Sequence, residues 1–420
     1  MKAINWILLL LFAATFPLAD VQAQGFDATS LGMGRAYGGV ARGVESLTWN
    51  PANLALPRSS FFEMNFIGLN LNVSNSAMTL ENYRRYFTES GHGGDWDDQE
   101  KQQILDLVPD DGLDVNGEAG ANALGMVFGR YGFGVQAIGN ARGLLPRGPF
   151  EIILFGNVSD LYRFGDVDAD EFTAVKFSLA ASHPIPLKKF FKAFGLGLNL
   201  NYYWALNQAQ IENAGGVLYT GADIIYADMD IAARTAEGGS GFSMDFGAAG
   251  DLDDEWTFSV VFRNLFGSIT WDKNPKAYLY NLAVDSAKYR QSFTLDPGLT
   301  DTSYTIDPYK TSIPVVFHMG VAFRPSKKVI LDLDIEQAFS KGMGYSEDAL
   351  LSIGTEYRPV EVVPLRAGLT FGGKWGFMMG LGIGFHFKAL QINIGYGSQK
   401  SVWPGSTKGY STGFDIKIII

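Results

Sequence analysis

From Phe61 onward the chain is dominated by short segments in which large apolar residues alternate with small or polar ones. Because successive side chains of a β-strand point to opposite faces, a period of two indicates strands with one apolar face. The pattern predicts about 14 strands (14–16), many about ten residues long, the length of a tilted strand that crosses a bilayer. The clearest examples lie at residues 194–206, 329–336, 377–387, 390–397 and 414–420.

The alternation alone leaves open which face points inward. A soluble sandwich buries its apolar faces, whereas a membrane barrel turns them outward and keeps a polar lumen. Here the faces opposite the apolar ones carry Gly, Asn and charged residues, which favours a polar lumen. Aromatic residues near predicted strand ends suit the two membrane interfaces; they are Tyr202, Trp204, Trp256, Trp375 and Tyr396. We therefore predict an all-β fold, a transmembrane antiparallel β-barrel over residues 58–420, with a soluble periplasmic β-domain as the alternative.

The predicted connections are of two lengths, as in barrels with short periplasmic turns and long outer loops. Residues 129–132, 324–327 and 358–361 read as short turns, and residues 79–117, 141–170, 272–311 and 398–410 read as outer loops. Within these loops, residues 80–108 look partly helical, and residues 149–164 fit a strand or a helix equally well.

The first residues predict export. Lys2 is followed by an apolar run and then by small residues before Ala23, which is the arrangement of a cleavable secretory signal peptide over residues 1–23. We expect export through the Sec pathway to the cell outer membrane, with outer-membrane lipid and lipopolysaccharide as surroundings. The net charge of -11 argues against nucleic acid as a partner. The absence of cysteine excludes disulfides and lipoprotein acylation.

Residues 24–57 have no strand period and are rich in small residues. We expect short helical patches at residues 35–40 and 52–56. Asn50 before Pro51 is typical of a helix cap with proline at the first helical position. Small residues allow close packing of backbone, so this segment is predicted to be a plug, or hatch, inside the barrel.

Two blocks of this segment resemble the N-terminal hatch of the FadL-type long-chain fatty-acid transporter superfamily. The matching residues are Gly32, Gly34, Arg35, Ala36, Tyr37 and Gly39, and then Asn50, Pro51 and Ala52. The resemblance implies a 14-stranded barrel, a lumen closed by the hatch, and lateral release of apolar ligands into the membrane. The superfamily also includes PorV-like proteins of type IX secretion and uncharacterised barrels of Bacteroidetes-type bacteria.

Charged residues share the expected inward register of three neighbouring strands; they are Asp332, Asp334, Glu336, Glu356, Arg358 and Arg366. Unpaired charge in a narrow space is costly, so we expect a ladder of pairs across strands. The ladder either braces the wall, anchors the hatch through Arg35, or lines a polar path. Phe26 and Trp49 are candidate contacts for an apolar ligand.

The sequence predicts no enzyme, cofactor or metal site. Residues 409–413 fit G-x-S-x-G, but no histidine follows them, so a hairpin loop is expected instead of a nucleophile elbow. The histidines lie at positions 92, 183, 318 and 386, without metal-ligand spacing.

The expected function is passive, hatch-gated uptake of hydrophobic, fatty-acid-like small molecules. The alternatives are a PorV-like barrel that docks a protein partner at its outer loops, and a structural outer-membrane protein.

Overall fold

The computed structural model describes residues 27–91, 94–156, 161–165, 167–221, 225–284 and 298–420. The predicted signal peptide and residues 24–26, including Phe26, lie outside this part of the chain.

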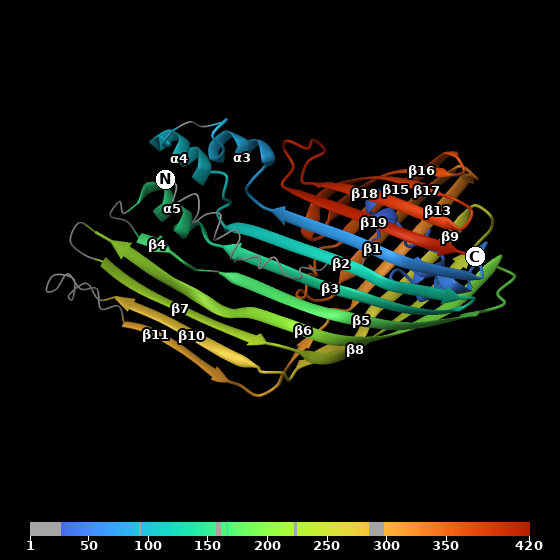
Figure 1. Ribbon diagram of the computed structural model, residues 1–420, viewed down its shortest axis with the longest axis horizontal. Coiled ribbons are helices and arrows are strands. Elements are labelled where there is room, and N and C mark those ends of the chain that lie inside the picture. The colour runs from blue at the N-terminus through green and yellow to red at the C-terminus, as the bar shows by residue number, and fades with distance from the viewer. Residues whose placement is uncertain (1–26, 92–93, 157–160, 166, 222–224, 285–297) are drawn as a thin grey trace.

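Within the described residues, fourteen antiparallel strands form a closed barrel (Figure 1). β19 pairs with β1 from Ile419 opposite Glu63 to Gly409 opposite Ser74, which closes the sheet without an edge. The barrel strands are β1 (Phe62–Asn75), β2 (Leu113–Phe128), β3 (Tyr131–Leu145), β5 (Asp168–Pro184), β6 (Ala193–Thr220), β8 (Gly239–Asp251), β9 (Trp256–Trp271), β13 (Val316–Ser326), β14 (Val329–Ala338), β15 (Leu350–Val360), β16 (Val363–Gly372), β17 (Gly376–His386), β18 (Leu390–Gln399) and β19 (Gly409–Ile419). The predicted fold class is confirmed.

The apolar faces point outward. On β14, Leu333 is 44% exposed, whereas its neighbour Asp334, on the other face, is 1% exposed. Leu200 of β6 and Leu381 of β17 are likewise exposed, as the alternation requires of a membrane barrel. The soluble β-domain is therefore wrong, because it would bury these residues. Among the described residues, no helix is long and apolar enough to span a membrane.

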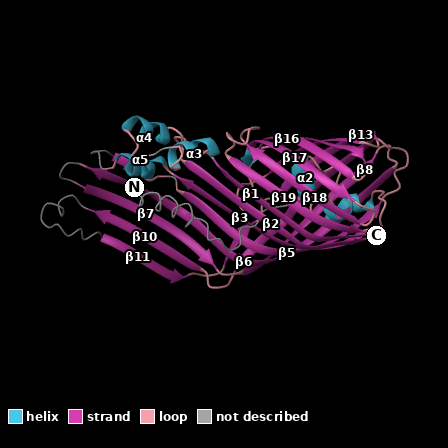
Figure 2. Cartoon of the chain, turned by 45° about the horizontal axis from the view of Figure 1, so that its top comes forward, coloured by secondary structure: helices cyan, strands magenta, loops and turns pink. Residues whose placement is uncertain are grey.

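The same sheet extends beyond one rim of the barrel (Figure 2). The later half of β6 pairs with β7 (Ile225–Ala236), which continues to β10 (Lys276–Val284) and β11 (Gly298–Thr305). β4 (Leu161–Arg163) pairs with β6, and β12 (Tyr309–Ser312) pairs with the end of β9. The predicted outer loops were therefore partly wrong: residues 272–311 contain strands, and parts of 79–117 and 141–170 extend β2, β3 and β5.

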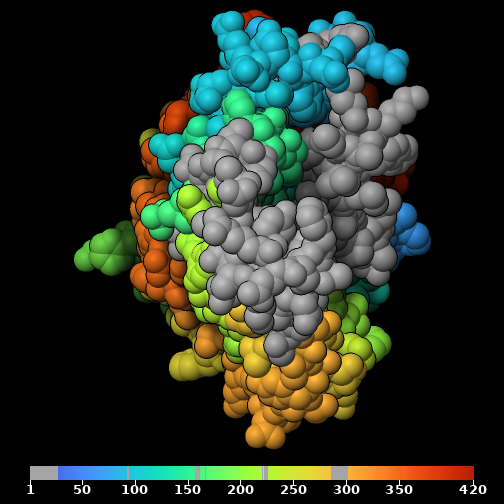
Figure 3. Space-filling model, turned by 90° about the vertical axis from the view of Figure 1, so that its left-hand side faces the viewer, coloured from blue at the N-terminus to red at the C-terminus, as the bar shows by residue number. Residues whose placement is uncertain are grey.

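Three helices lie at the same rim: α3 (Leu80–Phe87), α4 (Asp98–Leu105) and α5 (Arg147–Phe155). They pack around Tyr86, Ile104, Leu105 and Leu154. Viewed from this rim, the helices gather at the top and β10 and β11 at the bottom (Figure 3). The prediction of helix within residues 80–108 is confirmed, and residues 149–164 turn out to contain both a helix and a strand.

The opposite rim carries tight turns. The pairs Phe128–Tyr131, Ser326–Val329 and Val360–Val363 close three hairpins, which confirms the predicted short turns. Two other expectations were wrong. Residues 409–413 lie at the start of β19 and not in a hairpin loop. Trp375, in the 3-10 helix η3 (Gly373–Trp375), is buried against Leu31 rather than placed at the membrane interface.

Candidate functional site

The N-terminal segment, defined here as residues 27–57, lies inside the barrel (Figure 2). It contains the helix α2 (Ala28–Gly32) and the 3-10 helices η1 (Gly43–Leu47) and η2 (Pro51–Ala55). Asp27 and Ser30 form a capping box that starts α2. The expectation of a helical patch at residues 35–40 was wrong. Gly34 and Arg35 adopt left-handed backbone conformations, with φ of 59° and 67°, and these end the helical turn.

Glycines on the inner face of the wall allow the segment to lie directly against the strands. A Cβ atom at Gly368 would lie 2.1 Å from the carbonyl oxygen of Met33, and one at Gly197 would lie 2.2 Å from the amide nitrogen of Ala52. Similar clashes would arise at Gly247, Gly320, Gly354, Gly380 and Gly395. The glycines that alternate with large apolar residues along the wall strands thus form the seat of the N-terminal segment.

Two carboxylates of β14 hold the middle of the segment. Asp334 Oδ2 accepts hydrogen bonds from the amides of Tyr37 (2.8 Å) and Gly38 (2.7 Å), and Asp332 Oδ2 accepts one from Gly39 (3.2 Å). His318 Nε2 of β13 lies 3.1 Å from the same Asp334 oxygen. Three hydrogen bonds from consecutive backbone amides therefore tie the segment to the wall here.

Glu336, the third acidic residue of β14, joins two arginines. Its carboxylate lies 3.6 Å from Arg35 Nη2 and 2.5 Å from Arg263 Nη2 of β9. Burial lowers the pKa of the Arg35 guanidinium, and the nearby Glu336 charge opposes that shift. Burial also lowers the pKa of Arg42 to about 10, and Asp251 at the end of β8, 3.1 Å away, opposes it.

The remaining members of the predicted ladder form a separate group along the wall. Glu356 lies 2.7 Å from both Arg358 Nε and Arg366 Nε. Arg366 also donates to Asn393 Oδ1 of β18 at 2.9 Å. The six charged residues thus divide into three that contact the N-terminal segment and three that pair with one another.

The second motif block fastens the end of the segment. Asn50 caps η2 by accepting from the amide of Ala52 at 2.9 Å, as predicted for Asn before Pro51. Its amide nitrogen donates to Ser259 Oγ (2.8 Å) and to the Val260 carbonyl (3.0 Å), both on β9. Asn50 therefore links the segment to the wall as well as to its own helix.

Trp49 is 3% exposed, and its indole nitrogen donates to Asp27 Oδ2 at 3.0 Å. Its ring packs edge-on against Tyr37 and against His318. The structure therefore places Trp49 in the segment's own packing, where part of it lines a lumen pocket. Phe26, the other candidate contact, is outside the described residues.

Several wall residues that contact the segment were not singled out from the sequence. Asp415 of β19 accepts from the amide of Ala28 at 3.1 Å, Glu63 of β1 accepts from Val44 at 3.1 Å, and Lys417 forms an ion pair with Glu45. Asp415 and Lys417 occupy the polar face of a strand whose alternation is plain in the sequence. These residues could therefore have been found by assigning inward-facing positions on every predicted strand.

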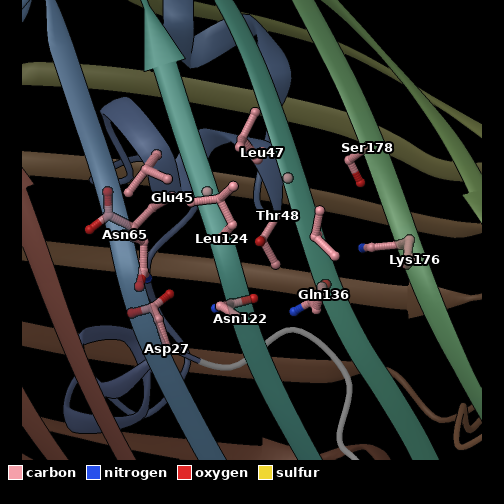
Figure 4. A pocket seen from close by; sticks show the side chains of 14 residues that line it. Asp27, Glu45, Leu47, Thr48, Asn65, Asn122, Leu124, Gln136, Lys176 and Ser178 are labelled. Carbon is pink, nitrogen blue, oxygen red and sulfur yellow. The ribbon is translucent and has the colours of Figure 1, made fainter.

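Three pockets follow one another along the lumen. The first holds 510 Å³ of empty space beside η1 (Figure 4), the second 740 Å³ and the third 420 Å³. The first two share Thr48, Gln136 and Lys176, and the last two share Arg35, Glu336 and Tyr345. Their linings mix charged and apolar side chains, so these pockets do not make a continuous apolar tunnel.

Comparison with known proteins shows which solved structures share this fold. Residues 227–397 match a family of unknown function, DUF5723, and no curated protein matches the chain. The toluene transporter TbuX of Ralstonia pickettii is 14% identical, with 94% of this chain and 97% of that chain covered and a TM-score of 0.53. The Pseudomonas putida toluene transporter TodX is 12% identical, with 95% and 98% covered and a TM-score of 0.52. A Pseudomonas aeruginosa FadL homologue is 14% identical, with 95% and 99% covered and a TM-score of 0.52.

This is the FadL-type barrel fold. At these identities the likeness establishes the fold and leaves the ligand to the residues of this chain. The named FadL-type neighbours are transporters rather than enzymes. Among the described residues, no group of three His, Asp or Glu is placed to hold a metal ion.

Proposed function

We propose that this protein is an outer-membrane channel for the passive entry of small hydrophobic molecules, and that residues 24–57 are its hatch. The supporting observation is the folded N-terminal segment seated in the lumen of a FadL-type barrel by contacts to wall side chains. An exported chain with a cleaved signal peptide, surrounded by lipid and lipopolysaccharide, belongs to the same proposal.

The contacts of the hatch are suited to a part that moves. Its middle is held by three amide-to-carboxylate bonds and its ends by Asn50 and Asp415, rather than by strand pairing. Ion pairs of Arg35, Arg42 and Glu45 with wall side chains add to these bonds. Such bonds can exchange with water one at a time. A shift of the hatch would join the three pockets, which already share lining residues.

A place for sideways release lies in β9. Asn264 and Phe266 have left-handed φ values of 60° and 56°, and pairing with β13 stops at Arg263 while pairing with β12 resumes at Ser268. Phe266 points outward and is 87% exposed, whereas Asn264 lines the second pocket. The interruption therefore brings a lumen pocket close to the lipid-facing surface.

The test is uptake into proteoliposomes whose outer leaflet contains lipopolysaccharide, since a plain lipid bilayer passes hydrophobic molecules by itself. Radiolabelled toluene and a fluorescent long-chain fatty acid are supplied outside, and initial rates are compared with protein-free vesicles. We expect faster uptake of at least one of the two. Equal rates from a barrel that is folded, as judged by heat-modifiable migration, would reject the transport proposal for both ligand types.

A protein-docking role is the second candidate, favoured by the strands and helices described at this rim. β7, β10 and β11 extend a sheet beyond the barrel, and α3, α4 and α5 build a small core beside it. In this role the lumen stays closed. Absence of uptake from the folded barrel would favour it.

A further inference from the structure

The outward surface of β18, β19 and β1 ends in lysines at the rim that carries the helices. The alternation that turns every second residue of β19 into the lumen directs Phe414 and Tyr410 outward. Lys408, which precedes β19, continues this outward series, because its backbone still pairs with the neighbouring strands. On β18 the outward Tyr396 is followed by Lys400, one residue beyond the strand. The apolar surface of the barrel therefore gives way to tyrosines and then to cations.

The ammonium groups of the two lysines converge. Lys408 Nζ donates to the backbone carbonyl of Ser76 at 2.6 Å, and Lys400 Nζ donates to that of Asn75 at 3.3 Å. The two acceptors are adjacent residues at the end of β1, so the two positive charges lie side by side. Burial, and after it the charge of Lys408, lowers the pKa of Lys400. An ammonium has three donors, and each of these lysines therefore has donors left for an anion.

The protein itself does not neutralise this pair. Among the described residues, neither lysine forms an ion pair with a carboxylate. Asp114, whose charge acts on Lys400, lies 3.1 Å from Arg142 Nη2 and is engaged there. The helix α3 lies near the outer ends of β1 and β19 (Figure 1), where the amide of Glu81 donates to the Gly405 carbonyl at 3.0 Å. Two like charges held together without a counterion repel one another, so the site is suited to an external anion.

The surface beside the lysines is suited to acyl chains. Ile394 of β18 is 46% exposed and Leu71 of β1 is 48% exposed. Tyr396 and Tyr410 lie between these apolar residues and the lysines, with their ring centroids 6.3 Å apart, as is typical of a membrane interface. Trp403, in the connection between β18 and β19, is 74% exposed. Apolar, aromatic and cationic groups thus follow one another in the order in which a phosphorylated lipid presents its chains and its headgroup.

We propose that this surface binds lipid A, the phosphorylated glycolipid part of lipopolysaccharide, with one phosphate accepting from Lys400 Nζ and Lys408 Nζ while acyl chains lie along β18, β19 and β1. The rim lies opposite the tight turns, and it therefore faces the outer leaflet in the proposed function. A phosphate monoester carries a charge of about −1.5 to −2 near pH 7, which matches two adjacent ammonium groups better than the single charge of a phospholipid diester. The inference rests on the outer-membrane placement in the proposed function and is independent of transport.

The test is native mass spectrometry of the folded protein in a maltoside detergent, titrated with three lipids in turn. The probes are lipid A with its phosphate monoesters, the same glycolipid with the phosphates removed, and phosphatidylglycerol. We expect lipid A to bind about tenfold or more tightly than its phosphate-free form, because one hydrogen bond between charged groups contributes about a factor of ten. Phosphatidylglycerol, with its singly charged phosphate, should bind more weakly than lipid A.

The double variant Lys400→Gln with Lys408→Gln removes both charges and keeps polar side chains. We expect it to weaken lipid A binding about tenfold or more and to leave binding of the phosphate-free form unchanged. Lys400→Arg with Lys408→Arg keeps both charges and should retain lipid A binding, which separates the role of charge from that of packing. The matched control is Lys327→Gln with Lys328→Gln, which removes two charges from the exposed turn between β13 and β14 at the opposite rim. Heat-modifiable migration shows that each variant is folded.

Equal affinity for lipid A with and without phosphates, or undiminished lipid A binding by the folded glutamine variant, would overturn the proposal. Phosphatidylglycerol binding as tightly as lipid A through the same lysines would overturn the choice of lipid. Such results together with uptake of toluene or fatty acid would leave the channel function standing. Lipid A binding by a barrel that takes up neither probe would instead leave the lipid site standing without the channel.

Discussion

Asp334→Ala tests how the N-terminal segment is held. The substitution removes the acceptor of the Tyr37 and Gly38 amides, which lie 2.8 and 2.7 Å from Asp334 Oδ2. Bonds to a charged group contribute about 1.5–3 kcal/mol each, so the segment should lose about 3–6 kcal/mol of local stability. At about 1.4 kcal/mol per factor of ten, local opening should become about 10²–10⁴ times more frequent.

The assay is hydrogen-exchange mass spectrometry on peptides covering residues 33–41, in detergent and at one pH. Protection of these amides should fall by the stated factor, while protection of the wall strands stays within its normal range. Asp334→Asn keeps a neutral acceptor, so the protection of these amides should fall less than in Asp334→Ala. Asp114→Ala, which removes a partner of Arg142 rather than of the segment, is the control. Unchanged protection in Asp334→Ala would refute the reasoning, because it would mean that other contacts alone set the position of the segment.

Three further predictions address the seat, the cap and the outer face. Gly368→Leu should push Met33 off the wall and expose the segment to protease in an otherwise folded barrel. Gly143→Ala, with no atom within 4 Å of the added Cβ, should leave the segment protected. Protection of the segment in both variants would contradict the claim that the wall glycines seat it. Asn50→Ala leaves several partners unpaired and should lower the stability of the segment by about 2–4 kcal/mol, seen as earlier proteolysis near residues 50–56 on heating. Leu333→Arg places a charge on the lipid-facing surface and should cost about 2–4 kcal/mol near the midplane, measured by urea titration of heat-modifiable migration; a neutral effect would show that this face does not meet lipid.

The barrel was predictable because its signal is local. Each membrane strand must satisfy lipid on one face and the lumen on the other, so its residues alternate whatever its neighbours are. β10 and β11 fall within residues 272–311, which were expected to be a loop. β11 carries Thr, Asp and Ser on both faces, and so its sequence resembles a loop.

The N-terminal segment was predictable in its parts but not in its conformation. The Asn50–Pro51 cap is a local device, and it lies where the sequence indicates. The path of residues 35–40 depends on Asp332 and Asp334, nearly 300 positions later, which accept hydrogen bonds from the amides of Tyr37, Gly38 and Gly39. In the same way, Lys400 and Lys408 converge only because both reach the end of β1.

The central claim, that the N-terminal segment gates the lumen, is tested most directly by tethering it. The chain contains no cysteine. A Cβ at Gly413 of β19 would lie 3.4 Å from the Cβ of Ala28, close to the roughly 3.5–4.5 Å of a disulfide, and 2.9 Å from the Ala28 Cα, so the start of α2 must shift slightly to accept it. The double variant Ala28→Cys with Gly413→Cys is placed in the lipopolysaccharide vesicles, with each single variant as control. Uptake should fall when the disulfide is formed and recover when it is reduced. The same uptake rate in both states would contradict the account.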